Sequence, residues 1–313
     1  MRLGFFTSCF YESELDQIAE WAQVGGFRAL EVAVWPHADV RHYNPAHIDV
    51  EHLDERGADQ LRTVLNERGI MISSLAYYGN NLHADPDTRR LTNRHVKRVI
   101  DAAVLLGVSN IGTFIGRDMT KSVLENVHQA EQVFPELVDY AGERSIDVVI
   151  ENCVMEGWHP DGYPANLAYS PELWEWMFEE LGVYLNFDPS HLVWMGIDPV
   201  AALRPYVDRV KHVQAKDIQI SPQDRTRFGW PGRIFGKKDG WDTGWWRYRV
   251  PGRGDVDWRG VIDTLAEGGY DGTISVEHED PVWSGSIERV RAGLEIARRT
   301  LEPLIVDPTP VDA

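Results

Sequence analysis

Strand-like and helix-like segments alternate eight times along this chain of 313 residues. Apolar residues recur with period two in the short segments and at helical spacing in the longer ones, as in repeated βα units. The strand-like segments are residues 2–6, 28–34, 70–76, 110–115, 146–152, 184–188, 210–216 and 273–277. The helix-like segments are residues 14–24, 57–68, 89–106, 123–144, 171–181, 200–207, 258–267 and 287–300. Eight such units predict an α/β fold in which parallel strands close into a (β/α)8 TIM barrel.

The main alternative is an open, doubly wound sheet. Such a sheet would more often carry a glycine-rich phosphate loop after its first strand. Here the first strand runs into residues 7–13, which read TSCFYES and contain no glycine. With 43% hydrophobic residues, a chain of this length suits one barrel domain spanning residues 1–313.

Four predicted strands deliver an oxygen-bearing side chain at or near their carboxyl end: Glu151, Asp188, Gln214 and Glu277. The apolar residues of each strand occupy the opposite parity, so these four side chains point inward if the apolar face packs under the helices. The carboxyl ends of parallel barrel strands meet at one opening. Three or four hard oxygen ligands meeting there are what a divalent cation requires. We therefore expect the metal and the chemistry at this opening.

Each of these residues also has a purely structural interpretation. Asp188 precedes Pro189 and Ser190 and can serve as a helix cap, whereas Gln214 can serve as a polar filler of the barrel. Glu151 and Glu277 are harder to explain in this way, because each closes an apolar strand where an unpaired charge is costly. A bound cation would remove that cost.

A long segment, residues 218–257, separates the seventh strand from its helix. It is rich in glycine and arginine and contains Trp230, Trp241, Trp245 and Trp246. Loops this long are uncommon in compact domains and usually act as lids or binding loops. Because Trp and Arg also anchor subunit interfaces, the segment is predicted to be a lid, a subunit contact, or both.

Charge and composition restrict the partners. A formal net charge of −18 disfavours binding to nucleic acid or to an anionic membrane surface, since both contacts depend on clustered Lys and Arg. Two cysteines, Cys9 and Cys153, are too few for a disulfide framework at this size. No stretch approaches the roughly 18 apolar residues of a membrane span, and the first residues lack a signal-peptide pattern. We expect a cytoplasmic protein that acts on a small molecule.

The motifs VVIEN, NFDPSH, HVQAKD and ISVEHED, in this order, resemble the sugar phosphate isomerase and epimerase superfamily with the xylose-isomerase-like barrel. That group includes tagatose and psicose epimerases, inosose dehydratase and C-glycoside-cleaving enzymes. The resemblance implies that Glu151, Asp188 and Glu277 are metal ligands. It also implies that Glu151 and Glu277 form the acid and base pair, and that His191 lies near the substrate or the outer shell of the metal.

The seventh strand departs from the family pattern. Relatives usually read His-x-His-x-Lys-Asp, with the second histidine on the metal, whereas this chain has Gln214 at that position. A glutamine oxygen still coordinates, and replacing imidazole by an amide shifts the expected ion toward Mn²⁺, with Mg²⁺ or Co²⁺ as alternatives, and away from Zn²⁺. His212 has the same parity but lies two residues deeper, roughly 6.6 Å along the strand. Gln214 is therefore the preferred fourth ligand, with His212 as the alternative.

Further residues are candidates for substrate binding because they follow predicted strands on the same face or have side chains suited to a sugar. They are His191, His83, Asn81, Trp158, Lys216 and Arg253. Each has an equally ordinary structural interpretation, such as a cap, a loop contact or, for Arg253, an ion pair with a neighbouring aspartate. Aromatic faces such as Trp158 pack well on the apolar faces of sugar rings.

We therefore predict a divalent-metal-dependent isomerase or epimerase of a keto sugar or sugar-like polyol. In this reaction a proton is removed next to a carbonyl and an enediolate forms. The alternative is a lyase on a ketone-bearing sugar, either an inosose dehydratase or an enzyme that cleaves 3-oxo-glycosides. A barrel that binds a sugar without catalysis is the non-enzymatic alternative. We expect a homo-oligomer, with a smaller partner subunit as a further option.

Overall fold

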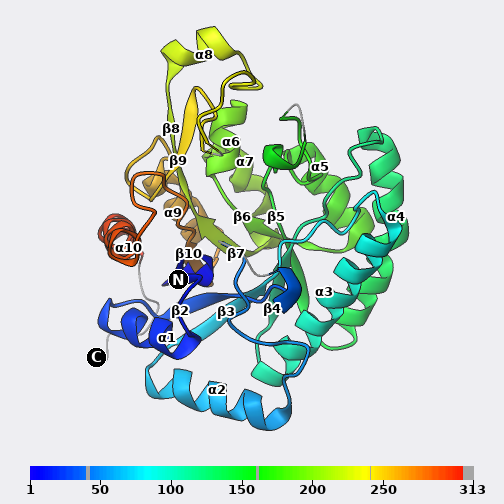
Figure 1. Cartoon of the computed structure of the whole chain (residues 1–313), viewed down its shortest axis with the longest axis vertical. Coiled ribbons are helices and arrows are strands. Elements are labelled where there is room, and N and C mark those ends of the chain that lie inside the picture. Colours follow the sequence, from blue (N-terminus) through cyan, green and yellow to red (C-terminus); the bar gives the residue numbers. More distant parts are fainter. Residues whose placement is uncertain (40–42, 160–161, 240, 306–313) are drawn as a thin grey trace.

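The computed structural model describes residues 1–39, 43–159, 162–239 and 241–305, and eight of its strands form a closed parallel barrel (Figure 1). These strands are β1 (Arg2–Phe6), β2 (Ala29–Ala33), β3 (Met71–Ala76), β4 (Asn110–Thr113), β5 (Asp147–Glu151), β6 (Tyr184–Phe187), β7 (Val210–Ala215) and β10 (Thr273–Val276). Strand β1 pairs in parallel with both β2 and β10, which closes the ring. The predicted (β/α)8 barrel is confirmed, and each strand ends within two residues of the bounds expected from the sequence.

Helices surround the barrel in the predicted order. They are α1 (Leu15–Val24), α2 (Glu55–Glu67), α3 (Pro86–Leu106), α4 (Val123–Gly142), α5 (Pro171–Trp176), α6 (Ser190–Met195), α7 (Pro199–Leu203), α9 (Trp258–Glu267) and α10 (Ile287–Leu301). The predicted fifth helix is divided, because α5 continues as a π-helical turn over Met177–Leu181. The predicted sixth helix is shorter than expected, since a 3₁₀ segment with a proline in its first turn begins at Arg204. None of the described helices is both long and apolar enough to cross a bilayer.

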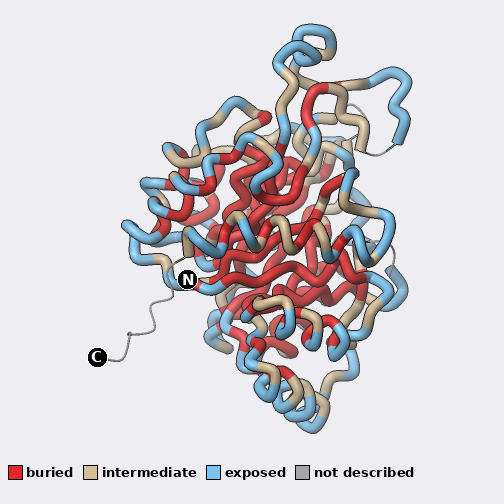
Figure 2. The backbone as a smooth tube through the Cα atoms, turned by 90° about the vertical axis from the view of Figure 1, so that its left-hand side faces the viewer, coloured by how far each residue is buried: buried red, intermediate tan, exposed pale blue. Residues whose placement is uncertain are grey.

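Apolar residues fill the space between the strands and the helices. Val148 and Ile150 of β5 and Phe187 of β6 are buried there, as the period-two pattern predicted. Figure 2 shows this buried layer running through the centre of the molecule, with exposed backbone confined to the periphery. The inward parity is polar, and it carries the side chains of the site.

The partly buried His47 predicts acid sensitivity of the fold. His47 Nδ1 lies 2.8 Å from Thr7 Oγ1, and Nε2 lies 3.3 Å from the Phe10 carbonyl oxygen. Burial lowers the pKa of His47 from 6.5 to about 4. As the pH falls, His47 is therefore protonated in the unfolded chain before it is protonated in the folded protein. The contribution of neutral His47 to the free energy of unfolding is complete above pH 6.5. It decreases between pH 6.5 and pH 4, by about 3 kcal/mol in total.

The thermal unfolding midpoint, measured between pH 7.5 and pH 4.5, checks this expectation. The variant His47→Gln keeps a donor and an acceptor but does not titrate, so its midpoint should fall less steeply with acid than that of the wild type. Parallel curves for the two proteins would show that protonation of His47 has no part in the loss.

Within the long segment after β7, the chain forms a two-stranded antiparallel sheet that was not predicted. It consists of β8 (Asp217–Ile220) and β9 (Trp246–Arg249), with α8 (Pro222–Phe228) between them. We call residues 217–257 the insertion. Figure 1 shows it projecting at the top of the view, above the barrel opening. Trp246 stacks on Trp194 of α6, with ring centroids 4.5 Å apart and an interplanar angle of 3°.

Two buried aspartates fasten the insertion to the barrel. Asp217 accepts hydrogen bonds from the backbone amides of Gly252, Gly254 and Val256, at 2.9 to 3.1 Å, and from the Trp258 indole. Asp280, just beyond β10, accepts from the Arg249 side chain at 2.9 Å and from the Val250 amide at 3.0 Å. Asp217 begins the insertion directly beyond β7 and Asp280 lies beyond β10, so the base of the insertion is held at the rim of the barrel.

The close approach of Gly254 to Asp217 predicts a large effect of a single methyl group. A Cβ at Gly254 would lie 2.3 Å from both Asp217 Oδ1 and the Ile218 carbonyl oxygen. We expect Gly254→Ala to break this anchor and to lower the free energy of unfolding by several kcal/mol, at the upper end of the range for single substitutions. Gly142→Ala, where a Cβ would meet nothing within 4 Å, is the matched control for a thermal unfolding measurement. Equal midpoints for the two variants would contradict the anchor.

Candidate metal centre and active site

Three carboxylates that are far apart in the sequence meet at the carboxyl end of the barrel. Glu151 is the last residue of β5, and Asp188 and Glu277 directly follow β6 and β10. All three are buried, and one oxygen from each lies within 4.8 Å of the others. The structure thus brings together the three acidic residues predicted from strand parity.

Local hydrogen bonds fix the Asp188 carboxylate and leave one oxygen available. Asn152 Oδ1 accepts from the Asp188 amide at 2.7 Å, and Asn152 Nδ2 donates to the Asp188 carbonyl at 2.8 Å, which ties β6 to β5. Asp188 Oδ1 accepts from the Ser190 amide at 2.8 Å, so the capping role is present. Asp188 Oδ2 and Glu151 Oε1 have no hydrogen-bond partner among the described residues. Asp188 therefore caps a helix and also presents an oxygen to the site.

Lys216, the first residue after β7, lies among these carboxylates. Its Nζ is 2.7 Å from Glu277 Oε2, 3.2 Å from Asp188 Oδ2 and 4.0 Å from Glu151 Oε1. A fourth carboxylate, Glu279, is 3.3 Å away. The lysine side chain is buried, so it offers a fixed positive charge at the centre of the cluster.

Burial and charge move the pKa values of this cluster in different directions. Burial is the largest influence on Glu277 and Glu151 and raises the pKa of both carboxyl groups above the ordinary value, most strongly for Glu277. Burial also opposes ionisation of Asp188, but Lys216 and His191 outweigh it and lower the pKa of Asp188 to about 2. Carboxyl groups that differ in this way can hold and release protons in one site.

His191 connects the carboxylates to the insertion. Its Nε2 lies 3.3 Å from Asp188 Oδ2 and 3.4 Å from Glu151 Oε1, and its Nδ1 lies 3.2 Å from the Tyr248 hydroxyl of β9. The Tyr248 ring also packs against Lys216, with Nζ 4.9 Å from its centroid. Cys153 and His191, together with Glu151, form a second group with ligand atoms within 4.8 Å of one another.

Gln214 lies two residues before Lys216 and contacts a buried acidic residue that was not predicted. Its Nε2 donates to Glu31 Oε1 at 3.0 Å and to the Tyr78 hydroxyl at 3.1 Å. Its Oε1 is buried and has no hydrogen-bond partner among the described residues. The amide is therefore oriented by its nitrogen, and the oxygen remains available to a ligand.

His212 occupies a deeper position in the barrel. Its Nε2 lies 3.1 Å from Ser73 Oγ, and its Nδ1 lies 3.1 Å from Asn186 Oδ1. Both ring nitrogens thus have neutral partners, and burial lowers the pKa of His212 to about 3. Of the two candidates for a fourth ligand, only Gln214 has a bare acceptor atom.

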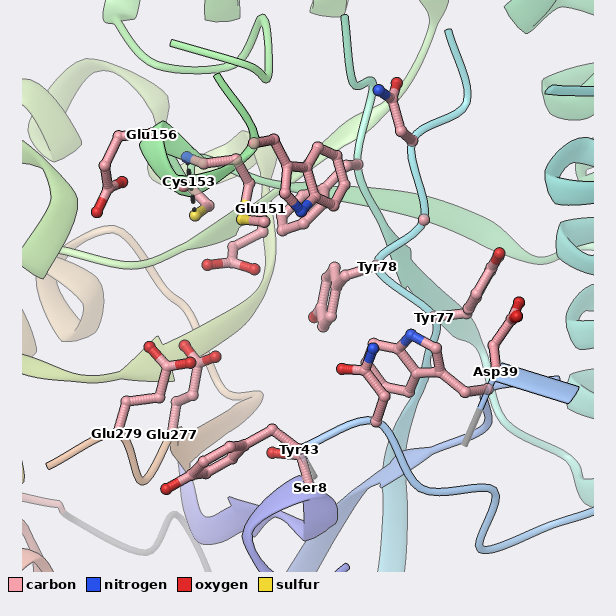
Figure 3. Close-up of a pocket in the computed structure, with 18 of the residues that line it drawn as sticks. Ser8, Asp39, Tyr43, Tyr77, Tyr78, Glu151, Cys153, Glu156, Glu277 and Glu279 are labelled. Atoms are coloured by element: carbon pink, nitrogen blue, oxygen red, sulfur yellow. Dashed lines mark hydrogen bonds between the residues drawn. The ribbon is translucent and has the colours of Figure 1, made fainter. Parts of the chain in front are cut away.

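The carboxylates open into a cavity of about 910 Å³. Among the candidate substrate-binding residues, His191, His83, Trp158 and Lys216 line this cavity. Figure 3 shows Glu277, Glu279 and Glu151 on one side of it and Tyr77 on the other. A volume of this size lies at the upper end of the range for small-molecule sites.

Two candidates, Asn81 and Arg253, are not among the residues that line the cavity. Asn81 is fully buried, donates to Thr113 Oγ1 at 3.1 Å and to the Phe114 carbonyl at 2.7 Å, and so supports the loop after β3. Arg253 is exposed and is not among the residues that line the cavity. Asn81 follows the barrel strand β3 and Arg253 follows β9 of the insertion, and a loop residue has no fixed parity that would reveal its direction.

The donor set fits one divalent cation. Four carboxylates face two basic side chains, Lys216 and His191, which leaves two negative charges when all of these groups are ionised. Within the described ranges, Gln214 Oε1 has no hydrogen-bond partner, and Glu151 Oε1 and Asp188 Oδ2 make only ion pairs, at 3.2 to 4.0 Å from Lys216 Nζ and His191 Nε2. Buried oxygens of this kind are costly unless a partner binds them. The oxygen donors Glu151, Asp188, Gln214 and Glu277 suit a hard ion such as Mn²⁺ or Mg²⁺.

Comparison with known proteins gives a family match and several similar structures. A family model described as a xylose isomerase-like TIM barrel matches residues 18–300. Inosose dehydratase from Clostridium tetani is 38% identical over 112 residues, so the match spans only 34% of this chain and 34% of that enzyme.

Solved structures resemble almost the whole chain. A zinc-bound structure of the IolI protein has a TM-score of 0.69 and 18% identity, covering 97% of this chain and 96% of that chain. The 3-keto-D-glucoside 4-epimerase YcjR from E. coli has a TM-score of 0.66 and 15% identity, with coverages of 96% and 99%. At these identities the likeness shows a common fold.

Proposed function

The chain belongs to the xylose isomerase-like TIM barrel family, and from that premise we propose that it is a divalent-metal-dependent isomerase or epimerase of a keto sugar or a sugar-like polyol. The observation that carries this proposal is the meeting of Glu151, Asp188 and Glu277 around Lys216 at the mouth of the barrel. Family members among the similar proteins include epimerases and inosose dehydratases.

The proposed metal ligands are Glu151, Asp188, Gln214 and Glu277. Glu151, Asp188 and Glu277 supply buried carboxylate oxygens, and Gln214 supplies an amide oxygen that has no hydrogen-bond partner among the described residues. With this oxygen set we propose Mn²⁺ as the resident ion, with Mg²⁺ or Co²⁺ as alternatives. When bound, such an ion polarises a carbonyl and stabilises negative charge that develops on it.

Glu151 and Glu277 are the proposed acid and base. One removes the proton from the carbon next to the carbonyl, and the other returns a proton. Return to the opposite face of the same carbon gives an epimer, whereas return to the neighbouring carbon gives an isomer. Burial raises the pKa of both carboxyl groups, which suits them to hold a proton between the two steps. Lys216 Nζ, 2.7 Å from Glu277, holds that carboxylate in place.

His191 and Lys216 are the proposed contacts for substrate oxygens. Both line the cavity. His191 Nε2 lies next to the Asp188 carboxylate, and Lys216 Nζ lies next to the Glu277 carboxylate. Tyr248 orients His191 from the insertion, which gives the insertion a part in shaping the site. Trp158 and His83 lie further along the cavity lining and are proposed to contact the rest of the substrate.

A lyase acting on a ketone-bearing sugar is the second candidate. It is supported by the identity of 38% to an inosose dehydratase over about a third of the chain. The same base would remove the proton next to the carbonyl, and a group on the adjacent carbon would then leave instead of a proton being returned. Product analysis separates the two reactions, because a lyase releases water or an aglycone and an epimerase does not.

We further propose that the protein is a cytoplasmic homo-oligomer.

Metal analysis together with solvent-deuterium exchange tests the proposal. The purified protein is incubated in D₂O with ketoses, inososes and 3-oxo-glycosides, and the products are analysed by mass spectrometry and NMR. We expect one tightly held divalent ion per chain and deuterium next to the carbonyl of at least one class. If the protein holds no divalent ion and catalyses no deuterium exchange with any of these sugars, the remaining interpretation is a barrel that binds a sugar without catalysis.

A further inference from the structure

The buried side chain of Glu31 points into the interior of the barrel. Glu31 lies in the middle of β2, which pairs with neither β7 nor β10, and yet its carboxyl group contacts side chains of both strands. Glu31 Oε1 accepts from Gln214 Nε2 of β7 at 3.0 Å and from the Tyr78 hydroxyl at 2.6 Å. Glu31 Oε2 accepts from the Ser275 hydroxyl of β10 at 2.9 Å and lies 4.0 Å from His212 Nδ1. Both carboxyl oxygens are therefore engaged by protein groups from across the barrel.

The Tyr78 hydroxyl is the second contact of the Gln214 amide, and it too is an acceptor toward that amide. It accepts from Gln214 Nε2 at 3.1 Å and from Asn186 Nδ2 at 2.8 Å. A phenol has a single hydrogen to donate, and that of Tyr78 is directed to Glu31 Oε1. Tyr78 therefore has no hydrogen left for the Gln214 oxygen. Loss of the Glu31 carboxyl group would release this hydrogen and would also remove the direct contact to Gln214.

These two contacts decide which end of the Gln214 amide remains free. The oxygen and the nitrogen of an amide have nearly the same shape, so half a turn of the group exchanges them. Because Glu31 Oε1 and the Tyr78 hydroxyl both accept, Nε2 is held on their side and Oε1 on the other. That oxygen has no hydrogen-bond partner in the part of the chain that the structure describes. A nitrogen in its place would present hydrogen atoms and could not coordinate a cation.

The hydrogen bond from Gln214 does not require Glu31 to be charged. Burial raises the pKa of Glu31 to about 8, so the neutral carboxyl group is present at pH 7. A neutral carboxyl group has one hydrogen, which Oε2 can donate to the Ser275 hydroxyl oxygen while Oε1 still accepts. The orientation of the Gln214 amide therefore depends on an acceptor oxygen at this place, and not on a negative charge.

We propose that Glu31 is a positioning residue for the metal centre, which holds the Gln214 amide with its oxygen toward the ion. The inference rests on the proposed function in one respect, because that function makes Gln214 a metal ligand. Glu31 acts through Gln214 and is not itself a ligand, since hydrogen-bond donors engage both of its oxygens. Removing an outer partner of this kind typically weakens metal binding by about 10- to 100-fold.

The affinity of the metal-stripped protein for Mn²⁺, measured by electron paramagnetic resonance of the free ion, tests the inference without turnover. Three substitutions at one position separate orientation from charge. Glu31→Gln keeps an acceptor oxygen and loses the charge, so it should bind Mn²⁺ within about threefold of the wild type. Glu31→Asp keeps the charge but withdraws the carboxyl group by one methylene, and Glu31→Leu keeps the approximate volume without an acceptor. Each of these two should bind Mn²⁺ about 10- to 100-fold more weakly, and the aspartate variant serves if the leucine variant fails to fold.

Ser275→Ala is the matched control, because it removes the hydrogen bond to the other oxygen of Glu31 and leaves the Gln214 contact in place. It should bind Mn²⁺ as the wild type does. In a Gln214→Ala background, Glu31→Leu should cause no further loss, since its effect passes through the missing amide.

The failures of this inference and of the proposed metal centre can be distinguished. Weaker binding in Gln214→Ala with wild-type binding in Glu31→Leu and Glu31→Asp would overturn the role of Glu31 alone. Full affinity in Glu31→Asp with a large loss in Glu31→Gln would do the same, because charge and not orientation would then be decisive. Unchanged affinity in Gln214→Ala would overturn both the proposed ligand set and the role of Glu31.

Discussion

In Glu277→Gln, deuterium exchange into the substrate should fall by about 10²–10⁴-fold, the usual loss when a positioned general acid or base is removed. The Glu277 carboxylate is buried, and glutamine preserves its volume and a hydrogen-bond acceptor for Lys216. Glutamine cannot take up or deliver a proton at this position. We expect a loss of similar size for Glu151→Gln, since the two carboxyl groups share the proton transfers. Mass spectrometry of the recovered sugar measures the rate.

The metal content of each variant separates the two proposed roles of these residues. An amide oxygen still coordinates a hard ion, so a variant that retains the ion and loses exchange has lost the acid or base and not the metal. Glu136→Gln on the exposed face of α4 is the control and should exchange at the wild-type rate. Exchange that persists at the wild-type rate in both active-site variants would remove Glu151 and Glu277 from the chemistry.

Stripping the protein with a chelator should reduce exchange to background, and adding Mn²⁺ should restore it. An ion that binds the folded chain and not the unfolded chain also raises the free energy of unfolding. The increase is about 2.7 kcal/mol when the free ion concentration is a hundred times Kd. Thermal unfolding with and without Mn²⁺ therefore gives a readout that is independent of catalysis. The preference for Zn²⁺ over Mn²⁺ should be small in this protein, because the proposed ligands are all oxygens.

Gln214→His tests the origin of that preference. The substitution places imidazole where relatives have it, so the stabilisation by Zn²⁺ should increase relative to that by Mn²⁺. Gln214→Ala should weaken binding of both ions. A stripped wild-type protein that keeps full exchange, or a Gln214→Ala variant with unchanged metal affinity, would contradict the proposed centre.

Strand parity was enough to predict much of the site. Period-two alternation placed Glu151, Asp188 and Glu277 on one face of three strands, and parallel pairing in a closed barrel brought their ends together. Glu31 could have been found in the same way, because it is the one charged residue in the buried strand Ala29–Ala33. Strand parity therefore predicts the facing of residues within a strand and of the first residue after its carboxyl end.

Residues in connections could not be placed from the sequence. Tyr248 reaches His191 because β9 pairs in antiparallel register with β8, and that register depends on the fold of the intervening residues. The positions of Asn81 and Arg253 away from the cavity lining could not be predicted for a related reason, since the direction of a loop side chain depends on its local hydrogen bonds.

Anchorage by Asp217 and Asp280 has a consequence for protein engineering. Asp217 stands at the base of the projection and Asp280 on the barrel rim, whereas the apex of the projection, which includes the nine-tenths exposed Phe235, lies far along the chain from either of them. Its apex can therefore be shortened, lengthened or exchanged between homologues while the two attachment points stay in place. Grafts made at that apex offer a way to change ligand preference while leaving the catalytic floor intact.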